Sequence, residues 1–255
     1  MYFRVKRYNP CAFPAAMILL ILIAFFAAFT QSLTGFGSGL ISMSLMPGLI
    51  GMKTSVPLVA MMTASLEIIL LFRYRKAFKL DKVWRLTLAS ILAIPFGVWA
   101  LRSLSDQVLL PILGVVMSGY ALYALLDLRL PNLEGRGWAY LTGLLAGLLS
   151  GAYSVGGPPV IIYANCRGWD PDEFKGNLQA FFLVNDLFAL VNHALVGNLT
   201  PTVLTDYGWL VPALGLGLLA GGAVDRYIDP DRFRRIVLVL LFLMGLRFIL
   251  SAFAG

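Results

Sequence analysis

Residues 32–47 read SLTGFGSGLISMSLMP and lie inside an almost uninterrupted apolar run that extends from Pro14 to about Ile50. This run is too long for one simple membrane span, because about 20 apolar residues cross a bilayer as a helix. Its interior is rich in glycine, which destabilises a helix by about 1 kcal/mol relative to alanine. The sequence therefore predicts a membrane helix that is broken between Gly35 and Gly39.

A second interruption of the same kind, SGAYSVGGPP, covers residues 150–159. The longest polar connection, DLRLPNLEGRG at 127–137, separates the two interruptions and divides the chain almost in half. On each side an apolar run is followed by a Gly/Ser break, a short apolar piece and three ordinary spans. We interpret the chain as two transmembrane repeats, residues 1–126 and 138–255, joined by the loop 127–137.

The composition indicates an integral membrane protein. Of 255 residues, 59% are hydrophobic and only 13% are charged, with a mean hydropathy of +0.83. The apolar runs are long and do not alternate with polar residues, which favours helices over a barrel. We expect an all-α polytopic bundle of about eight spans, with broken or re-entrant helices near the start of each half. The segments that begin near 37, 138 and 158 look short and are expected to be half-helices.

The positions of Lys and Arg bear on how the chain is threaded. If each broken run crosses once, the repeats are parallel and these residues divide 11 to 8 between the two sides; if it turns back, the repeats are inverted and the division is 14 to 5. Cytoplasmic loops carry the excess of Lys and Arg, so we favour inverted repeats. That choice places Arg4, Lys6 and Arg7 outside, although the first helix often sets the orientation.

The net charge of +7 does not indicate nucleic-acid binding, because the basic residues occupy short loops between apolar runs. Cys11 and Cys166 are isolated, so neither a disulfide nor a metal site is expected. No phosphate loop, nucleophile elbow or Cys/His metal spacing is present, and we expect no cofactor and no enzymatic activity.

Each break predicts a cavity, because freed backbone groups inside a membrane must be satisfied by protein or water. A half-helix that starts at a break presents unpaired N–H groups and a positive dipole end, which bind anions. Pro158 and Pro159 suit the first turn of such a half-helix. We predict a small-anion site where the two breaks meet, with substrate-binding residues Gln31, Thr34, Gly35, Gly37, Ser38, Gly39, Ser42, Tyr153, Ser154, Gly156, Gly157, Pro158 and Asn185. The alternative is a purely structural role, in which the glycines only allow close helix packing.

Glu67 and Asp186 are the acidic residues that sit well inside apolar spans. Ionisable groups at membrane depth are costly and indicate function by default. Around Asp186, polar residues recur at steps of seven and share a helix face; they are Gln179, Asn185, Asp186, Asn192 and His193. We expect Glu67, Asp186 and His193, the single histidine, to be the candidates for proton coupling. The alternative is a structural hydrogen bond to the broken backbone.

The segments TGFGSGLISMSLMP, LLAGLLSGAYSVGGPPVIIY and KGNLQAFFLVNDL together resemble the sulfite exporter TauE/SafE family over nearly the whole chain. The resemblance implies secondary transport of a small sulfur-containing anion, of the sulfite or organosulfonate class, across a bacterial inner membrane. The positions that carry over most directly are Gly35, Gly37, Gly39, Gly156, Gly157, Pro158 and Asp186. This chain has Ser38 where family members often continue a glycine run.

Other functions stay open at this point. The same breaks could form the filter of an anion channel, or the carrier could move a different small organic anion. An intramembrane enzyme would have to use Ser154 with His193, and a scaffold would need neither break. The expected partners are the small anion, protons and the lipid bilayer; a homodimer is among the assemblies that the sequence allows.

Overall fold

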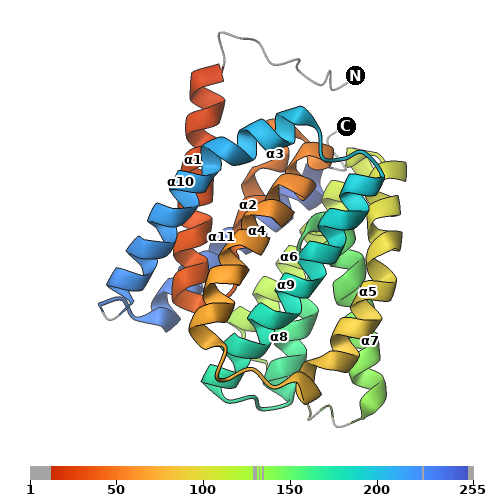
Figure 1. Cartoon of the computed structure of the whole chain (residues 1–255), viewed down its shortest axis with the longest axis vertical. Coiled ribbons are helices and arrows are strands. Elements are labelled where there is room, and N and C mark those ends of the chain that lie inside the picture. The colour runs from red at the N-terminus through yellow and green to blue at the C-terminus, as the bar shows by residue number, and fades with distance from the viewer. Residues whose placement is uncertain (1–12, 129–130, 132, 134, 226, 252–255) are drawn as a thin grey trace.

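The structure, a computed structural model, describes residues 13–128, 131, 133, 135–225 and 227–251, which form eleven α-helices and no strand (Figure 1). They are α1 (Phe13–Thr34), α2 (Ser38–Leu45), α3 (Pro47–Ile50), α4 (Met52–Tyr74), α5 (Leu80–Ser103), α6 (Asp106–Leu125), α7 (Arg136–Tyr153), α8 (Gly157–Cys166), α9 (Pro171–Leu195), α10 (Pro201–Val224) and α11 (Pro230–Ser251). Helices α1, α4, α5, α6, α9 and α10 are long and apolar enough to cross a membrane. The prediction of an all-helical, polytopic membrane protein is confirmed.

Two pairs of helices pack closely and run in the same direction. On α10, Gly217 and Gly221 lie against successive turns of α1, and on α7, Gly143 and Gly147 lie against successive turns of α5. A Cβ atom at any of these four positions would collide with a backbone carbonyl of the facing helix. Small residues of this kind let membrane helices approach closely. These four glycines allow the close packing of both helix pairs.

The other principal pairs are antiparallel. At the centre, Thr63 of α4 contacts Asp186 of α9, while Tyr74 at the end of α4 lies beside Gly176 near the start of α9. Helices α6 and α11 also run in opposite directions. Exchanging α1, α4, α5 and α6 with α7, α9, α10 and α11 reproduces the principal packed pairs. Because the exchanged helices α4 and α9 are antiparallel, the two-fold axis lies in the membrane plane, and the halves are inverted.

The chain turns back at both breaks. Gly35, just after α1, packs against Lys175 of α9, and Lys175 also lies over the ring of Tyr74 at the end of α4. Helices α1 and α4 thus end on the same side, so α2 and α3 return across the bundle between them (Figure 1). In the second half, Arg167 at the end of α8 donates a hydrogen bond to the carbonyl oxygen of Leu133, three residues before α7 begins, so α8 folds back along α7.

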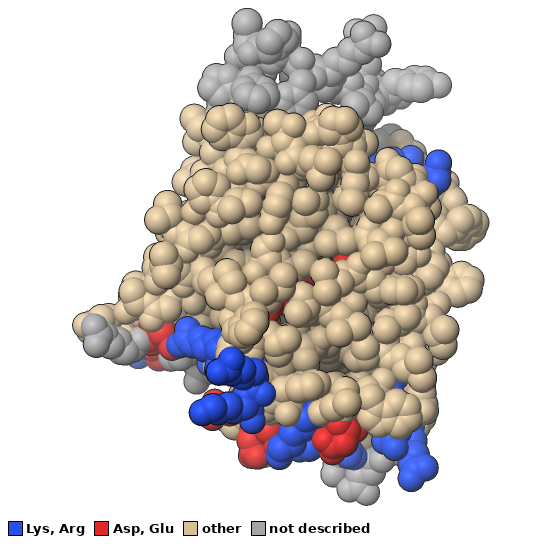
Figure 2. Space-filling model, viewed as in Figure 1, with Lys and Arg blue, Asp and Glu red and all other residues tan. Residues whose placement is uncertain are grey.

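One end of the bundle is strongly basic, and we name it the basic end (Figure 2). Its described basic residues, on the loops and helix ends from α4 to α5, α6 to α7, α8 to α9 and α10 to α11, are Arg73, Arg75, Lys76, Lys79, Lys82, Arg85, Arg136, Arg167, Lys175, Arg232, Arg234 and Arg235. Lys53 and Arg102 lie at the opposite end. Arg129 and Arg226, expected at the basic end, and Arg4, Lys6 and Arg7, expected at the other, lie outside the described residues.

The helix lengths correct one expectation. The segments from 37 and 158 are short, with 8 residues in α2 and 10 in α8. The segment from 138 is not a half-helix, because α7 begins at Arg136 and continues to Tyr153 for 18 residues. At 1.5 Å per residue it is about 27 Å long, close to the thickness of a bilayer core. The helix continues through Gly151, which the sequence pattern placed in the break, because this glycine packs against α5.

Candidate functional site

Both breaks place residues in left-handed backbone conformations. Gly35 and Gly37 have φ angles of 79° and 103°, and Gly37 immediately precedes the first turn of α2. At the second break, Ser154 ends α7 with a φ of 51°. A left-handed residue reverses the direction of the chain after a helix. Pro158 and Pro159 then occupy the first turn of α8, as predicted, where a missing N–H is tolerated.

The two breaks meet at the centre of the bundle. A Cβ on Gly39 would lie only 2.7 Å from the carbonyl oxygen of Ser154, so glycine is required for this approach. Between the breaks is a cavity with about 40 Å³ of space that the centre of a water molecule can occupy. One water needs roughly 10–15 Å³ by this measure, so the cavity has room for a few waters or one small ion.

The cavity is lined by both breaks, both central helices and a few apolar side chains. The lining residues are Gln31, Phe36, Gly37, Ser38, Gly39, Leu40, Thr63, Glu67, Ser150, Ser154, Val155, Gly156, Gly157, Ile161, Phe182 and Asp186. The N-terminal ends of α2 and α8 both open into it, so two positive dipole ends converge on one space. This arrangement is suited to an anion.

Two carboxyl groups share the cavity. Glu67 extends from α4 and Asp186 from α9, and the two groups contact each other. Both residues are buried, with exposed fractions of 3% and 6%. Thr63 donates its hydroxyl to Asp186, whereas Oε2 of Glu67 has no hydrogen-bond partner among the described residues. The inverted symmetry thus brings the two intramembrane acids together.

A chain of amide hydrogen bonds spans the first break. Oε1 of Gln31 accepts from the backbone N–H of Ser38 at 3.0 Å and from its hydroxyl at 2.7 Å. Nε2 of Gln31 donates to Oε1 of Gln179 on α9 at 3.5 Å. Nε2 of Gln179 in turn donates to the carbonyl oxygen of Gly35. The first break is therefore fastened to α9 by two buried glutamines.

Of the residues predicted from sequence, nine line this cavity: Gln31, Gly37, Ser38, Gly39, Ser154, Gly156, Gly157, Glu67 and Asp186. Seven do not: Thr34, Gly35, Ser42, Tyr153, Pro158, Asn185 and His193.

Four of those seven lie beside the first break or on the outer face of the second. The hydroxyl of Thr34 donates to backbone carbonyls of its own segment, and Ser42 is buried one turn along α2 from the cavity. Tyr153 and Pro158 line a separate apolar groove of about 820 Å³ between α5, α6, α7 and α8. The α7–α8 hairpin thus has a polar face toward the cavity and an apolar face toward the groove.

The polar stripe of α9 points in two directions. Gln179 and Asp186 face the first break and α4, but Asn185 accepts a hydrogen bond from Ser90 of α5. His193 is buried near the far end of α9, with Nδ1 3.0 Å from Nδ2 of Asn198. The expectation of one shared polar face is therefore too simple, since this helix packs between α4 and α5.

Among the polar lining residues, Thr63 was not predicted from the sequence. It precedes the predicted site residue Glu67 by four positions. Residues four apart share a helix face. That spacing was the available signal, although hydroxyl residues are common enough in membrane helices to hide it.

These features define a multi-pass helical membrane protein with a cavity between two broken helices at its centre. The chain belongs to the family described as sulfite exporter TauE/SafE, whose sequence pattern matches residues 20–248. It is also similar to the probable sulfite/organosulfonate exporter TauE of Cupriavidus necator, with 29% identity over 236 residues that cover 88% of this chain and 90% of the relative. No solved structure matches significantly.

Proposed function

We propose that this protein is a secondary transporter that moves a small sulfur-containing anion, of the sulfite or organosulfonate class, by alternating access. The observation that carries the proposal is the cavity in which the N-terminal ends of α2 and α8 face each other. The two helix ends direct backbone N–H groups at this space. The hydroxyls of Ser38, Ser154 and Thr63 also line it, and each would donate to an oxyanion after leaving its present acceptor on Gln31, Val56 or Asp186. The choice of a sulfur-containing anion rests on the family and on the similar exporter.

The inverted halves support alternating access rather than an open channel. Inverted repeats with discontinuous helices at the midplane are the usual design of carriers that rock one half against the other around a fixed site. We assign residues 1–126 and 138–255 to the two repeats. The basic end would face the cytoplasm, in keeping with the positive-inside rule.

Proton coupling follows from the charge of the cavity. An anion beside two ionised carboxylates in a low-dielectric space would be repelled by several kcal/mol even at an effective dielectric constant of about 20. A proton on the Glu67–Asp186 pair removes that repulsion. Anion binding and proton binding would therefore favour each other reciprocally, so the pair would take up a proton as the anion binds.

The test is counterflow in vesicles that contain the purified protein. Vesicles preloaded with unlabelled sulfite should transiently accumulate radiolabelled sulfite against its gradient, because a carrier exchanges one bound anion for another. Ser154→Ala combined with Ser38→Ala should reduce this uptake at least tenfold. Downhill flux without counterflow would instead indicate a channel. Equal sulfite uptake by the wild type and the double variant would contradict the proposed site.

A further inference from the structure

The donors that α2 offers to an anion are already occupied by a side chain of this protein. Gln31, which is 2% exposed, places Oε1 within hydrogen-bond distance of both the backbone N–H and the hydroxyl of Ser38. A neutral amide oxygen thus stands in the position that an oxygen of the anion would take. We propose that Gln31 is a resident acceptor that the transported anion displaces, and that this displacement releases α9 from the first break through Gln179. The inference rests on the proposed function.

The orientation of both amides is fixed by their partners. A backbone N–H can only donate, so the atom of Gln31 that faces Ser38 is the carbonyl oxygen. Its NH₂ group then faces Gln179 and requires an acceptor there. Gln179 accordingly turns its own NH₂ group to the carbonyl oxygen of Gly35, which can only accept. Neither amide can turn over alone without placing two donors or two acceptors against each other.

The two walls of the cavity differ in this respect. In the first turn of α8, Pro158 and Pro159 have no N–H group, so the N–H of Gly157 is the donor at this wall of the cavity, and no side chain among the described residues accepts from it. At this break, Ser150 of α7 lies beside Gly156. An anion can therefore contact the α8 wall directly, but it reaches the α2 wall only by replacing Oε1 of Gln31. The same cavity is lined by Glu67, whose buried Oε2 has no hydrogen-bond partner among the described residues. The cavity therefore contains a polar atom that the protein does not satisfy.

Displacement has a structural consequence at the basic end. When Gln31 leaves Ser38, Gln179 loses the partner that holds its amide toward Gly35. Lys175 lies on the same face of α9, one turn earlier, and its side chain packs over Gly35. Weakening this contact frees α1 and α9 to separate near the basic end. A carrier must rearrange more readily when loaded than when empty, and this relay makes the rearrangement depend on the anion.

Binding measurements test the displacement. Sulfite should raise the unfolding temperature of the purified full chain, and the concentration dependence gives an apparent Kd. Gln31→Met removes the competing oxygen at nearly constant volume, so sulfite should bind at least threefold more tightly. Gln31→Glu supplies a charged competitor and should bind at least tenfold more weakly. Thr34→Val, which alters the same break without touching Ser38, is the matched control and should not tighten binding.

The sign of the Gln31→Met effect decides the proposal, because a residue that binds the anion directly would weaken binding when lost. Unchanged or weaker binding would overturn it. If Gln31→Met does not fold, Gln179→Met serves, since it removes the amide that holds Gln31 in place and should also tighten binding. A wild-type protein that shows no response to sulfite would refute the proposed function itself, which is a separate outcome.

Hydrogen exchange tests the relay. In the wild type, sulfite should slow amide exchange in residues 38–42 and speed it in 33–36 and 174–180. In Gln179→Met the slowing should persist, whereas the sulfite-dependent speeding should be absent because those segments are already released. Slowing in α2 without any sulfite-dependent change in α9 of the wild type would overturn the relay and leave the anion site intact.

Discussion

Thr63 of α4 donates its hydroxyl to the carboxylate of Asp186 on α9, across the centre of the molecule and between the two inverted halves. The two residues are 123 positions apart, and Glu67 lies one turn along α4 on the same face. The contact therefore ties the acid pair to both repeats at once. Any change in the protonation of this pair acts on the interface between α4 and α9.

Asp186→Asn should remove the pH dependence of anion binding. In the wild type, raising the pH from 6 to 8 should weaken binding, because ionised carboxyl groups repel the anion. The asparagine variant keeps the hydrogen bond from Thr63 but carries one charge fewer, so its binding should change less than twofold. The probe should be a small sulfonate, whose own charge is constant over this range, and the readout is the ligand-induced rise in unfolding temperature.

The matched control is His193→Gln. His193 is buried outside the cavity beside Asn198, so its loss should leave the pH dependence of sulfonate binding intact. If His193→Gln abolishes the pH dependence and Asp186→Asn preserves it, the proton site has been assigned to the wrong residue.

Gly39→Ala should separate the two walls of the cavity. The added methyl group would lie 2.7 Å from the carbonyl oxygen of Ser154, which belongs to a backbone segment and cannot yield easily. Overpacking of this kind costs about 1–3 kcal/mol. We expect a lower unfolding temperature and loss of sulfite-induced stabilisation. Gly119→Ala, on a helix where nothing lies within 4 Å, should be neutral or stabilising. Equal behaviour of the two variants would contradict the proposed meeting of the breaks.

Much of this fold could be predicted because its signals are local. Hydropathy alone located the long helices, and the Gly/Ser breaks with Pro158 and Pro159 located the short ones. Inversion followed from the loop charges. The sequence did not indicate that Gly151 would remain helical, since that depends on the carbonyl group of Ile94 in α5 that faces it. Local composition cannot distinguish a glycine that ends a helix from one that packs it.

The site residues next to the breaks could be predicted from the sequence. Those on the long helices were harder to predict, because the packing of distant helices determines which side chains enter the cavity. Helix periodicity predicted one shared face of α9 for Asp186 and Asn185, but the position of α5 shows that Asn185 turns away to Ser90. Thr63 enters the cavity because α4 crosses α9 at that height. The partnership of Gln31 with Gln179 joins residues 148 positions apart and has no counterpart in any short motif.

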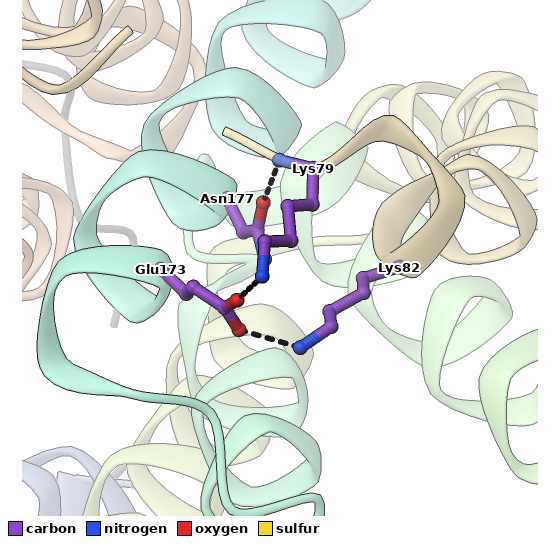
Figure 3. Close-up of polar contacts among 4 residues, drawn as sticks. All are labelled: Lys79, Lys82, Glu173 and Asn177. Carbon is purple, nitrogen blue, oxygen red and sulfur yellow. Dashed lines mark hydrogen bonds and ion pairs between the residues drawn. The ribbon is translucent and has the colours of Figure 1, made fainter. Parts of the chain in front are cut away.

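Glu173→Gln should loosen the basic end. Glu173, near the start of α9, forms ion pairs with Lys79 and Lys82 at the start of α5, and Asn177 accepts from the backbone N–H of Lys79 at 2.8 Å (Figure 3). The variant removes the carboxylate charge while keeping the shape, so the unfolding temperature should fall. Asp172→Asn, an exposed neighbour, is the control and should have little effect.

The effect of Glu173→Gln should also depend on pH. The hydrogen bond with Glu173, and then its charge, raise the pKa of Lys79 above its ordinary value of 10.5. A raised pKa contributes stability that is fully present below the unfolded value and is lost as the pH rises through the folded value. The difference in unfolding temperature between wild type and Glu173→Gln should therefore be constant from pH 7 to about 9 and shrink above about 10.5. A difference that grows with pH would exclude this ion pair as its cause.

Single cysteines can establish which side of the membrane the basic end faces. In a background without native cysteines, Lys76→Cys places a thiol in the loop between α4 and α5, and Lys53→Cys places one at the opposite end. If the basic end is cytoplasmic, a membrane-impermeant maleimide added to intact cells should label Lys53→Cys and spare Lys76→Cys until the membrane is broken. Because α1 and α4 end on the same side, this result would also place the start of α1 outside. The reverse labelling would show that the first helix, and not the excess of loop charges, sets the orientation.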